Sequence, residues 1–321
     1  MPTHASNGHI PPLGPEPPAQ SRQEANRDGS KRAPKLAAAT VLHNPGAAIL
    51  DGLLRPLEDD DLALFVFVNG ALDEASEARL GQSRATVIRS PINLGLGHGL
   101  NALVEAADEA KFPFILLFDQ DSVPQPGLAR DLVALFAGLP TGAVALGPRM
   151  AAPRGEHFLI PAVEPRGPAS NGSRPVNFLP TSGSLIEIDG WKRVGPFRAD
   201  YFIDGIDIEW CFRAWSRGYG VYIAEHLTMV HRWGRSGAWW TPQILRQPPS
   251  RTYYYIRNAV TTLRQCHIPR RWRLNFALRL AGQIVLLLGS PRRHFQGLRL
   301  ARHAIRDGLA GNLGEIPKDL V

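Results

Sequence analysis

Cysteine is scarce in this chain of 321 residues, with only Cys211 and Cys266. Two cysteines so far apart supply neither a disulfide framework nor a C-x-x-C metal pair, which favours a reducing compartment. The first residues, Met1–His4, include no basic segment leading into an apolar run, so no secretory signal is visible. We therefore expect a cytoplasmic protein.

Charge is also sparse, at 20% of the residues, whereas apolar residues make up 44%. These are ordinary globular proportions, and they exclude both a fully disordered chain and a multi-span membrane protein. Residues 242–321 contain 14 basic and three acidic residues, against 22 and 26 in residues 1–241. A cationic C-terminal quarter predicts an anionic partner, either a nucleic acid or a membrane surface.

Composition divides the chain into three parts. Residues 1–33 are rich in proline, serine and asparagine and poor in large apolar groups, so we expect a disordered leader. Residues 34–241 alternate between short apolar runs and helical patterns and form the main predicted domain. Residues 242–321 are predicted to be a basic helical region.

The alternation of strands and helices predicts a doubly wound α/β sheet. Runs such as Leu62–Val68 and Phe114–Phe118 are almost continuously apolar, as is typical of parallel strands covered on both faces. Residues 151–177 are polar and predict a long functional loop. The other expected strands are Leu36–Leu42, Thr86–Arg89, Ala143–Leu146, Phe178–Ile188 with an interruption at 181–184, and Tyr219–Ala224, and the expected helices are Ala47–Leu54, Gly99–Ala110, Leu128–Phe136 and Tyr201–Arg217.

The strongest local feature is Asp119–Asp121, an Asp-Gln-Asp sequence at the end of an apolar strand. Carboxylates two residues apart on a strand share a face, and at the mouth of an α/β sheet they could hold a divalent cation through oxygen. Such a cation would neutralise a diphosphate. The alternative is that the aspartates open a turn or cap the next helix.

A second acidic cluster contains Asp204, Asp207 and Glu209. Asp207 is flanked by apolar residues that could desolvate it, and this would raise its proton affinity toward that of a general base. The alternative is that these acids face the dipole of the next helix, with Glu209 paired to Arg213. His231, after a strand-like run, could complete a metal site or contact a phosphate oxygen, although a lone histidine is more often structural.

Several common sites are absent from the sequence. There is no P-loop pattern, and Gly95–Gly99 lacks the full spacing of a dinucleotide-binding turn. Ser182 and Ser184 do not lie in a G-x-S-x-G elbow, so a hydrolase nucleophile has no support.

Taken in order, the motifs resemble the inverting GT-A-fold glycosyltransferases of family 2, most closely the rhamnosyltransferase-like branch. The resemblance runs from about Leu36 to Asn312. It is carried by Val41–Pro45, Asn93–Gly95 with Asn101, Leu116–Ser122, Thr181–Ser184, Gly195–Phe197, Phe202–Arg213, Val230–His231, Tyr254–Arg264 and Arg306–Leu309.

The resemblance implies a mixed, mainly parallel sheet flanked by helices, with residues 34–241 as the catalytic domain. It implies that Asp207 is the catalytic base and that Asp121 and His231 bind Mg²⁺ or Mn²⁺. The other implied site residues are Asn44, Asn69, Asn93 and Asp119 for the nucleotide-sugar donor, and Ser182, Gly183, Asp204, Glu209 and Trp210 as acceptor-binding or supporting residues.

One position departs from the family pattern. After the second strand the family usually has Asp-Asn-Gly-Ser, with the aspartate on the nucleobase, whereas this chain has Val68–Ala71. Val68 cannot accept the N–H of a pyrimidine, so another group must do so or base selectivity is relaxed.

The resemblance implies transfer of L-rhamnose from dTDP-L-rhamnose, with inversion, to a polysaccharide or lipid-linked oligosaccharide. Two alternatives stay open. The chain could use another nucleotide sugar such as UDP-galactofuranose, or it could be a non-catalytic sugar-nucleotide or membrane-binding protein on the same fold.

The C-terminal region predicts two helices. Leu274–Leu288 is apolar, but 15 helical residues reach only about 22 Å, short of a hydrocarbon layer of roughly 30 Å. Phe295–Ala310 places leucines on one face and arginines along its flank, as suits a helix in the headgroup plane of an anionic leaflet at the inner face of the cytoplasmic membrane. The alternatives are packing on the catalytic domain or a homodimer. Nucleic acid is not expected, because no recognised motif accompanies the charge.

Overall fold

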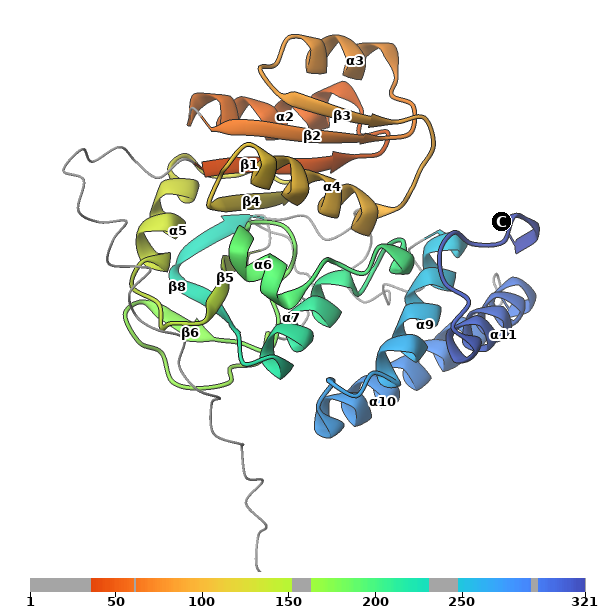
Figure 1. The fold of residues 1–321 in the computed structure, drawn as a ribbon. Helices are drawn as coiled ribbons and strands as arrows, with labels where there is room; N and C mark the ends of the chain where they lie inside the picture. The colour runs from red at the N-terminus through yellow and green to blue at the C-terminus, as the bar shows by residue number, and fades with distance from the viewer. Residues whose placement is uncertain (1–35, 61, 152–162, 231–247, 290–293, 321) are drawn as a thin grey trace, which may run out of the picture. The chain divides into compact units, whose positions relative to one another are not determined.

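The computed structural model describes residues 36–60, 62–151, 163–230, 248–289 and 294–320. Its centre is a sheet in the order β3-β2-β1-β4-β7-β5-β8-β6 (Figure 1). The strands are β1 (Leu36–Leu42), β2 (Ala63–Asn69), β3 (Thr86–Ser90), β4 (Phe114–Asp119), β5 (Ala143–Ala151), β6 (Ser173–Pro175), β7 (Ser184–Glu187) and β8 (Gly220–Val230).

The sheet is mixed and mainly parallel, which confirms the predicted fold class. Strands β3, β2, β1 and β4 pair in parallel, and β5 pairs in parallel with β8. β7 is antiparallel to both β4 and β5, and β6 is antiparallel to β8. The carboxyl ends of the parallel strands β1, β2 and β4 therefore meet along one edge, where ligands of such sheets bind.

Helices cover both faces of the sheet. The helices of the main domain are α2 (Ala47–Asp59), α3 (Glu74–Gly81), α4 (Leu96–Glu109), α5 (Leu128–Phe136), α6 (Ile188–Val194) and α7 (Ile206–Ser216). Side chains alternate along each strand, so β1 sends Ala37 and Ala39 toward α4, α6 and α7, and Leu36 and Ala38 toward α2, α3 and α5. This two-sided burial explains why the strands are continuously apolar.

Several segments differ from the sequence-based expectation. The expected helix Tyr201–Arg217 begins only at Ile206, because Ala199–Tyr201 form a 3₁₀ turn and Phe202 and Asp204 have positive φ values. The expected strand Phe178–Ile188 is much shorter, because β7 contains only Ser184–Glu187 and α6 begins at Ile188. The polar segment 151–177 contains the short strand β6, which pairs with the end of the sheet, while residues 152–162 lie outside the described residues. The expected strand Tyr219–Ala224 continues as β8 to Val230, with a register irregularity opposite Pro148 and Arg149.

Two glycines allow α4 to approach its neighbours closely. A Cβ at Gly97 would lie 2.6 Å from the carbonyl oxygen of Arg198, and one at Gly99 would lie 2.7 Å from Val41 of β1. The backbone N–H of Leu96 donates to the carbonyl oxygen of Phe202 at 2.5 Å. The glycine-rich turn thus serves close packing of α4 against the sheet and the 198–202 segment, rather than forming a dinucleotide turn.

The C-terminal region is helical, as expected, and has its own apolar cluster. It consists of α9 (Pro249–Leu263), α10 (Arg270–Leu288) and α11 (His294–Ala310). Tyr253, Leu280, Leu287 and Leu300 are among the residues buried in the cluster, and Phe202 and Ile203 of the main domain pack against it. Within the described ranges, no helix is long and apolar enough to cross a membrane.

Candidate active site

The Asp-Gln-Asp sequence lies at the carboxyl end of β4, in the middle of the sheet. Asp119 is the last residue of that strand and is paired with Val41 of β1, and Asp121 is exposed in the turn that follows. The Oγ of Ser182 accepts the backbone N–H of Asp119 at 3.4 Å and is hydrogen-bonded to the Oγ of Ser122. The sheet and the 181–184 turn together fix the backbone that carries both carboxylates.

Ser182 and Gly183 stabilise this turn through hydrogen bonds to β4 and to Ser122. The Ser182 side chain is buried, and the backbone N–H of Gly183 donates to the carbonyl oxygen of Leu117 in β4 at 2.7 Å. Gly183 has φ +77°, and a Cβ there would lie 3.0 Å from Pro148. Of the predicted roles for these two residues, the structure therefore fits support rather than contact with an acceptor.

A hydrogen-bonded network joins the carboxyl ends of β1, β2 and β4. Asn69 donates from Nδ2 to Oδ1 of Asn93 at 2.8 Å and accepts the backbone N–H of Leu94 at 2.7 Å. The backbone N–H of His43 donates to Oε1 of Gln120 at 2.8 Å, its Nδ1 lies 3.0 Å from the carbonyl oxygen of Asn69, and its Nε2 lies 3.5 Å from Nδ2 of Asn93. Asn69 and Asn93 are thus brought together and hold the loops of the site in register.

The predicted donor residue Asn44 lies at the same edge, as does Val68, where the chain departs from the family pattern. Asn44 follows β1, is exposed and has φ +48°. Val68, at the position where the family carries a nucleobase-binding aspartate, is buried in the cluster beneath α2. The Val68 side chain therefore points into the core, and the hydrogen-bonding partner of a nucleobase must be another residue.

Asp207 is the second residue of α7 and lies across the site from Asp119. Burial raises the pKa of the Asp207 carboxyl to about 6, and the negative charges of Asp119 and Asp204 add to the rise. The backbone N–H of Ile208 donates to Oδ1 of Asp207 at 2.8 Å and opposes the rise only in part. The two acidic clusters, which are far apart in the sequence, therefore meet in one site.

An arginine that the sequence did not single out completes this cluster. Arg251, at the start of α9, donates to both carboxylate oxygens of Asp204 at 2.9 to 3.2 Å. The charges of Asp204 and, to a smaller extent, Asp119 and Asp121 raise the pKa of Arg251. Among the described residues, the carboxylates of Asp119, Asp121 and Asp204 thus lie near one another and near Arg251, and their oxygens suit a bound cation.

The carboxylates suit a divalent cation that the substrate helps to hold. Asp119 and Asp121 offer hard oxygen ligands, but the described residues contain no group of three side chains spaced to hold a metal alone. Mg²⁺ is commonly bound by one or two carboxylates together with substrate phosphates. The donor set fits that arrangement, and the predicted ligand His231 lies outside the described residues.

Glu209 and Trp210 belong to another part of α7. Glu209 is 1% exposed, forms an ion pair with Arg213 at 3.0 Å and lies 3.1 Å from Nε2 of His267. Burial alone would raise the pKa of Glu209, but hydrogen bonds from His267 and Arg213 outweigh burial and lower it. Trp210 is buried and donates from Nε1 to the carbonyl oxygen of Gly195 at 2.9 Å.

The contacts of these two residues are with other parts of the protein's own fold. The Glu209–Arg213 pair borders a pocket of about 580 Å³ whose lining includes neither Asp119 nor Asp207. The sequence expectation that Glu209 pairs with Arg213 is confirmed.

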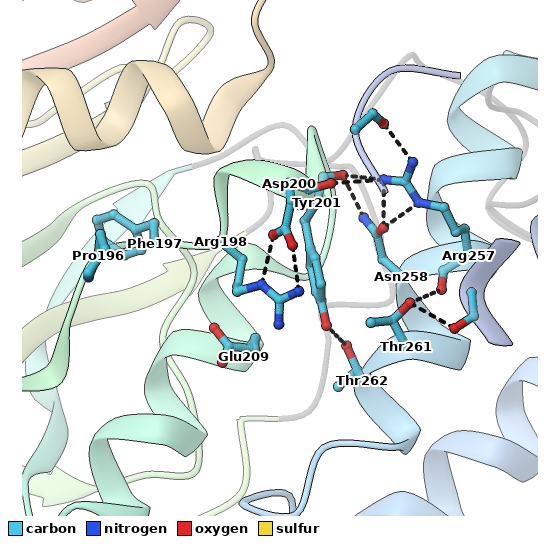
Figure 2. A network of polar contacts seen from close by, with 12 residues as sticks. Pro196, Phe197, Arg198, Asp200, Tyr201, Glu209, Arg257, Asn258, Thr261 and Thr262 are labelled. Atoms are coloured by element: carbon cyan, nitrogen blue, oxygen red, sulfur yellow. Dashed lines mark hydrogen bonds and ion pairs between the residues drawn. The ribbon is translucent and has the colours of Figure 1, made fainter. Parts of the chain in front are cut away.

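Residues 200–205, which lead into α7, are held by side chains of α9 (Figure 2). Nδ2 of Asn258 donates to backbone carbonyl oxygens of this segment, and the Arg257 guanidinium does the same. The Tyr201 hydroxyl is hydrogen-bonded to Oγ1 of Thr262 at 2.9 Å. Sequence analysis missed this contribution of α9, because polar residues in a helix usually indicate a solvated face.

Residues 54–174 match the model of the family described as Glycosyl transferase family 2. Over 288 residues the chain is 24% identical to the dTDP-rhamnosyl transferase RfbF of Shigella flexneri, and the match covers 87% of this chain and 97% of that protein.

Two solved structures share the fold. The S. aureus TarS 1–349 complex with UDP-GlcNAc has a TM-score of 0.55 and 14% identity, and the match covers 89% of this chain and 82% of that one. GalNAc-T7 with UDP, GalNAc and Mn²⁺ has a TM-score of 0.58 and 11% identity, covering 87% of this chain and 56% of that one.

Proposed function

We propose that this chain is a family 2 glycosyltransferase, the family whose model matches residues 54–174, and that it transfers L-rhamnose from dTDP-L-rhamnose with inversion. The acceptor is a polysaccharide or a lipid-linked oligosaccharide. Similarity to a dTDP-rhamnosyl transferase along nearly the whole of that protein supports the donor. The observation that carries the proposal is the raised pKa of Asp207, a carboxyl that meets the Asp119–Asp121 turn in one site.

Asp207 acts as the general base in this proposal. In a single displacement the acceptor hydroxyl loses its proton while the bond between the anomeric carbon and the diphosphate breaks. A carboxylate with a pKa of about 6 is a stronger base than an ordinary aspartate and is still ionised above that pH. The acceptor proton moves to a carboxylate oxygen of Asp207, and the attack comes from the face opposite the diphosphate, which gives inversion.

Asp121 would hold a divalent cation, Mg²⁺ or Mn²⁺, with Asp119 and His231 as further candidate ligands. When bound, the cation stabilises the negative charge of the departing diphosphate. The chain's own contribution is to keep both carboxylates on the fixed turn after β4, where Ser182 and the strand backbone hold them. Chelation therefore stops transfer, and Asp121→Asn weakens donor binding in the presence of Mn²⁺.

A donor screen tests the sugar and the base. The purified chain is incubated with dTDP-L-rhamnose, UDP-galactofuranose and other nucleotide sugars, with a lipid-linked glycan as acceptor and with Mg²⁺ or Mn²⁺. Release of dTDP only from dTDP-L-rhamnose supports the proposal. Turnover with UDP-galactofuranose alone would show that this nucleotide sugar, and not dTDP-L-rhamnose, is the donor. Donor binding without any turnover would favour a non-catalytic protein on the same fold.

We also propose that the C-terminal helices bind an anionic membrane surface, at the inner face of the cytoplasmic membrane. On α10 the side chains of Leu274, Leu278 and Val285 are 62%, 65% and 67% exposed. Their spacing of four and seven residues places them on one face of the helix, opposite the buried Leu280 and Leu287. On α11, Phe295 is 85% exposed and Leu298 49%.

Charge favours a lipid surface over a second copy of the chain on this face. Helix α10 has four arginines and no acidic residue, and α11 has three arginines and one aspartate. Two copies joined through α10 would bring arginines together without carboxylates to pair them. An anionic leaflet supplies the opposite charge, and each basic residue near the surface contributes about 1 kcal/mol to the free energy of membrane binding.

Flotation with vesicles tests this surface. Replacing both Leu274 and Leu278 by serine removes apolar groups worth about 1.5 to 3 kcal/mol each on full burial, so affinity for vesicles containing phosphatidylglycerol falls at least tenfold. Ile49→Ser, on the exposed side of α2, is the matched control and leaves binding unchanged. Equal binding by the double variant, or a dimer that the double variant dissociates, would overturn the proposal.

A further inference from the structure

We propose that Arg257 and Asn258 of α9 are positioning residues for Asp207, because they fix the backbone segment 200–205 from which α7 begins. This inference rests on the proposed role of Asp207 as the base. The C-terminal region would then position an active-site residue in addition to its proposed binding to a membrane surface.

Asn258 is hydrogen-bonded to three backbone carbonyl oxygens of the segment. Its side chain is 2% exposed, and its Nδ2 lies 2.9, 2.6 and 2.9 Å from the carbonyl oxygens of Tyr201, Ile203 and Asp204. An amide has two N–H groups, so the three carbonyl oxygens share them. Displacing any of the three carbonyls therefore disturbs the bonds to the other two.

Arg257 reinforces Asn258 from the same helix. Its side chain is fully buried, and it donates to the carbonyl oxygens of Tyr201 at 2.9 Å and Gly314 at 2.6 Å and to Oδ1 of Asn258 at 2.9 Å. Burial lowers the pKa of Arg257, which reflects the cost of removing a guanidinium from water. The hydrogen bonds of Arg257 to backbone carbonyl oxygens offset this desolvation cost, and they restrain the backbone that carries those oxygens (Figure 2).

The segment itself is strained and would not keep this shape alone. Phe202 and Asp204 have φ values of +65° and +66°, in the left-handed region that non-glycine residues avoid, and Gly205 follows at +78°. Phe202 is also stacked on Tyr254 of α9, with ring centroids 4.8 Å apart. Contacts with α9 thus stabilise a conformation that local preference opposes.

The position of Asp207 follows from this segment. Gly205 is the N-cap of α7 and Asp207 lies two residues later, so a shift of the segment moves the first turn of the helix. The ionisable groups around Asp207 are Asp119 of β4, Asp204 in the segment, Arg251 of α9 beyond it, and Cys211 one turn along α7. A looser segment lets water reach the Asp207 carboxyl and changes its distance from the acceptor.

Two variants of Asn258 test the inference in the full-length chain. Asn258→Ala removes the amide, and Asn258→Asp is isosteric and keeps an acceptor for Arg257 while losing the donor. We expect kcat for transfer to fall 10- to 100-fold in both, as follows from a small misplacement of a reacting group. The donor KM stays within threefold, and the acidic limb of the pH–rate profile moves below pH 6.

The matched control is Thr261→Ala, also on α9. Oγ1 of Thr261 is buried and bonded to the carbonyl oxygens of Arg257 and Gly308, within the C-terminal helices rather than to the segment. This variant lowers the melting temperature but leaves the acidic limb of the profile in place. Rates are expressed per amount of folded protein. If Asn258→Ala does not fold, the kcat and pH profile of the isosteric Asn258→Asp test the inference.

The outcomes separate this inference from the proposed function. If Asp207→Asn is inactive while both Asn258 variants keep the wild-type kcat and pH profile, Asn258 is merely structural and the inference fails alone. If Asp207→Asn transfers sugar at the wild-type rate, Asp207 is not the general base, and the proposed function is contradicted before the inference is tested.

Discussion

The carboxyl of Asp207 on α7 lies close enough to Asp119 at the end of β4 for the charge of Asp119 to raise its pKa. Asp119 is the last residue of a central strand of the sheet, and Asp207 lies in the first turn of α7. Their proximity gives a site with two functions: a negatively charged turn that suits a cation bound to a diphosphate, and a carboxylate with increased affinity for a proton.

The pH dependence of transfer follows from Asp207. Since a general base must be ionised, kcat/KM should rise with pH through about 6 and level off above 7. Asp204→Asn removes a negative charge near Asp207 and leaves Arg251 without its partner, and both changes favour the ionised form. The acidic limb should therefore move to lower pH in this variant, which tolerates the positive φ at position 204 because asparagine readily adopts it.

A pH–rate profile of both proteins checks this prediction. Asp189→Asn, on an exposed part of α6, is the control that should keep the wild-type profile. An acidic limb at the same pH in wild type and Asp204→Asn would contradict the assignment of that limb to Asp207.

Removing the Asp207 charge should stabilise the fold. The folded-state pKa of about 6 exceeds the ordinary value of 3.8, so the folded state binds the proton more tightly than the unfolded state does. Stability is therefore lost as the pH rises from about 3.8 to 6, and the loss remains at pH 7.5. Asp207→Asn should recover about 1 to 3 kcal/mol there, which exceeds the roughly 0.5 kcal/mol lost from the helix dipole.

Thermal unfolding of wild type and Asp207→Asn at several pH values measures this effect. The melting temperature of the variant should be higher at pH 7.5, and the difference should shrink toward pH 4.5. A variant that is less stable than wild type at pH 7.5 would show that the Asp207 carboxylate is well solvated or well paired.

Close packing of α4 can be tested with two glycine substitutions in helices. Gly97→Ala places a Cβ 2.6 Å from the backbone oxygen of Arg198, which cannot move freely, and should destabilise the fold by about 1 to 3 kcal/mol. Gly52→Ala in α2 meets no atom within 4 Å and should stabilise it by about 0.5 to 1 kcal/mol. Urea unfolding distinguishes them, and equal effects would contradict the packing argument.

The sequence predicts the sheet and the acidic turn well, because both depend on local pattern. β1, β2 and β4 are continuously apolar, and their burial on both faces is the reason. Asp119 could be located because a charged residue directly follows such a run. The short α6 was missed because its apolar residues continue those of β7 without a break in pattern.

The part of the site contributed by α9 could not be predicted in the same way. Arg257 and Asn258 have the composition of a solvated helix face, and only the fold shows that backbone carbonyls of residues 200–205 replace water around them. The resemblance implies acceptor-binding or supporting roles for Glu209 and Trp210. The pairing of Glu209 with Arg213 follows from the helical period, whereas the burial of Trp210 and its hydrogen bond to the carbonyl oxygen of Gly195 depend on the fold.

The most direct test of the account is sugar transfer by Asp207→Asn, measured together with its affinity for dTDP-L-rhamnose in the presence of Mn²⁺. We predict that transfer falls by about a thousandfold or more, since general-base catalysis contributes 10² to 10⁴, while the donor Kd changes less than threefold. Transfer at the wild-type rate, or loss of donor binding in parallel with transfer, would contradict the assignment of Asp207 as the base.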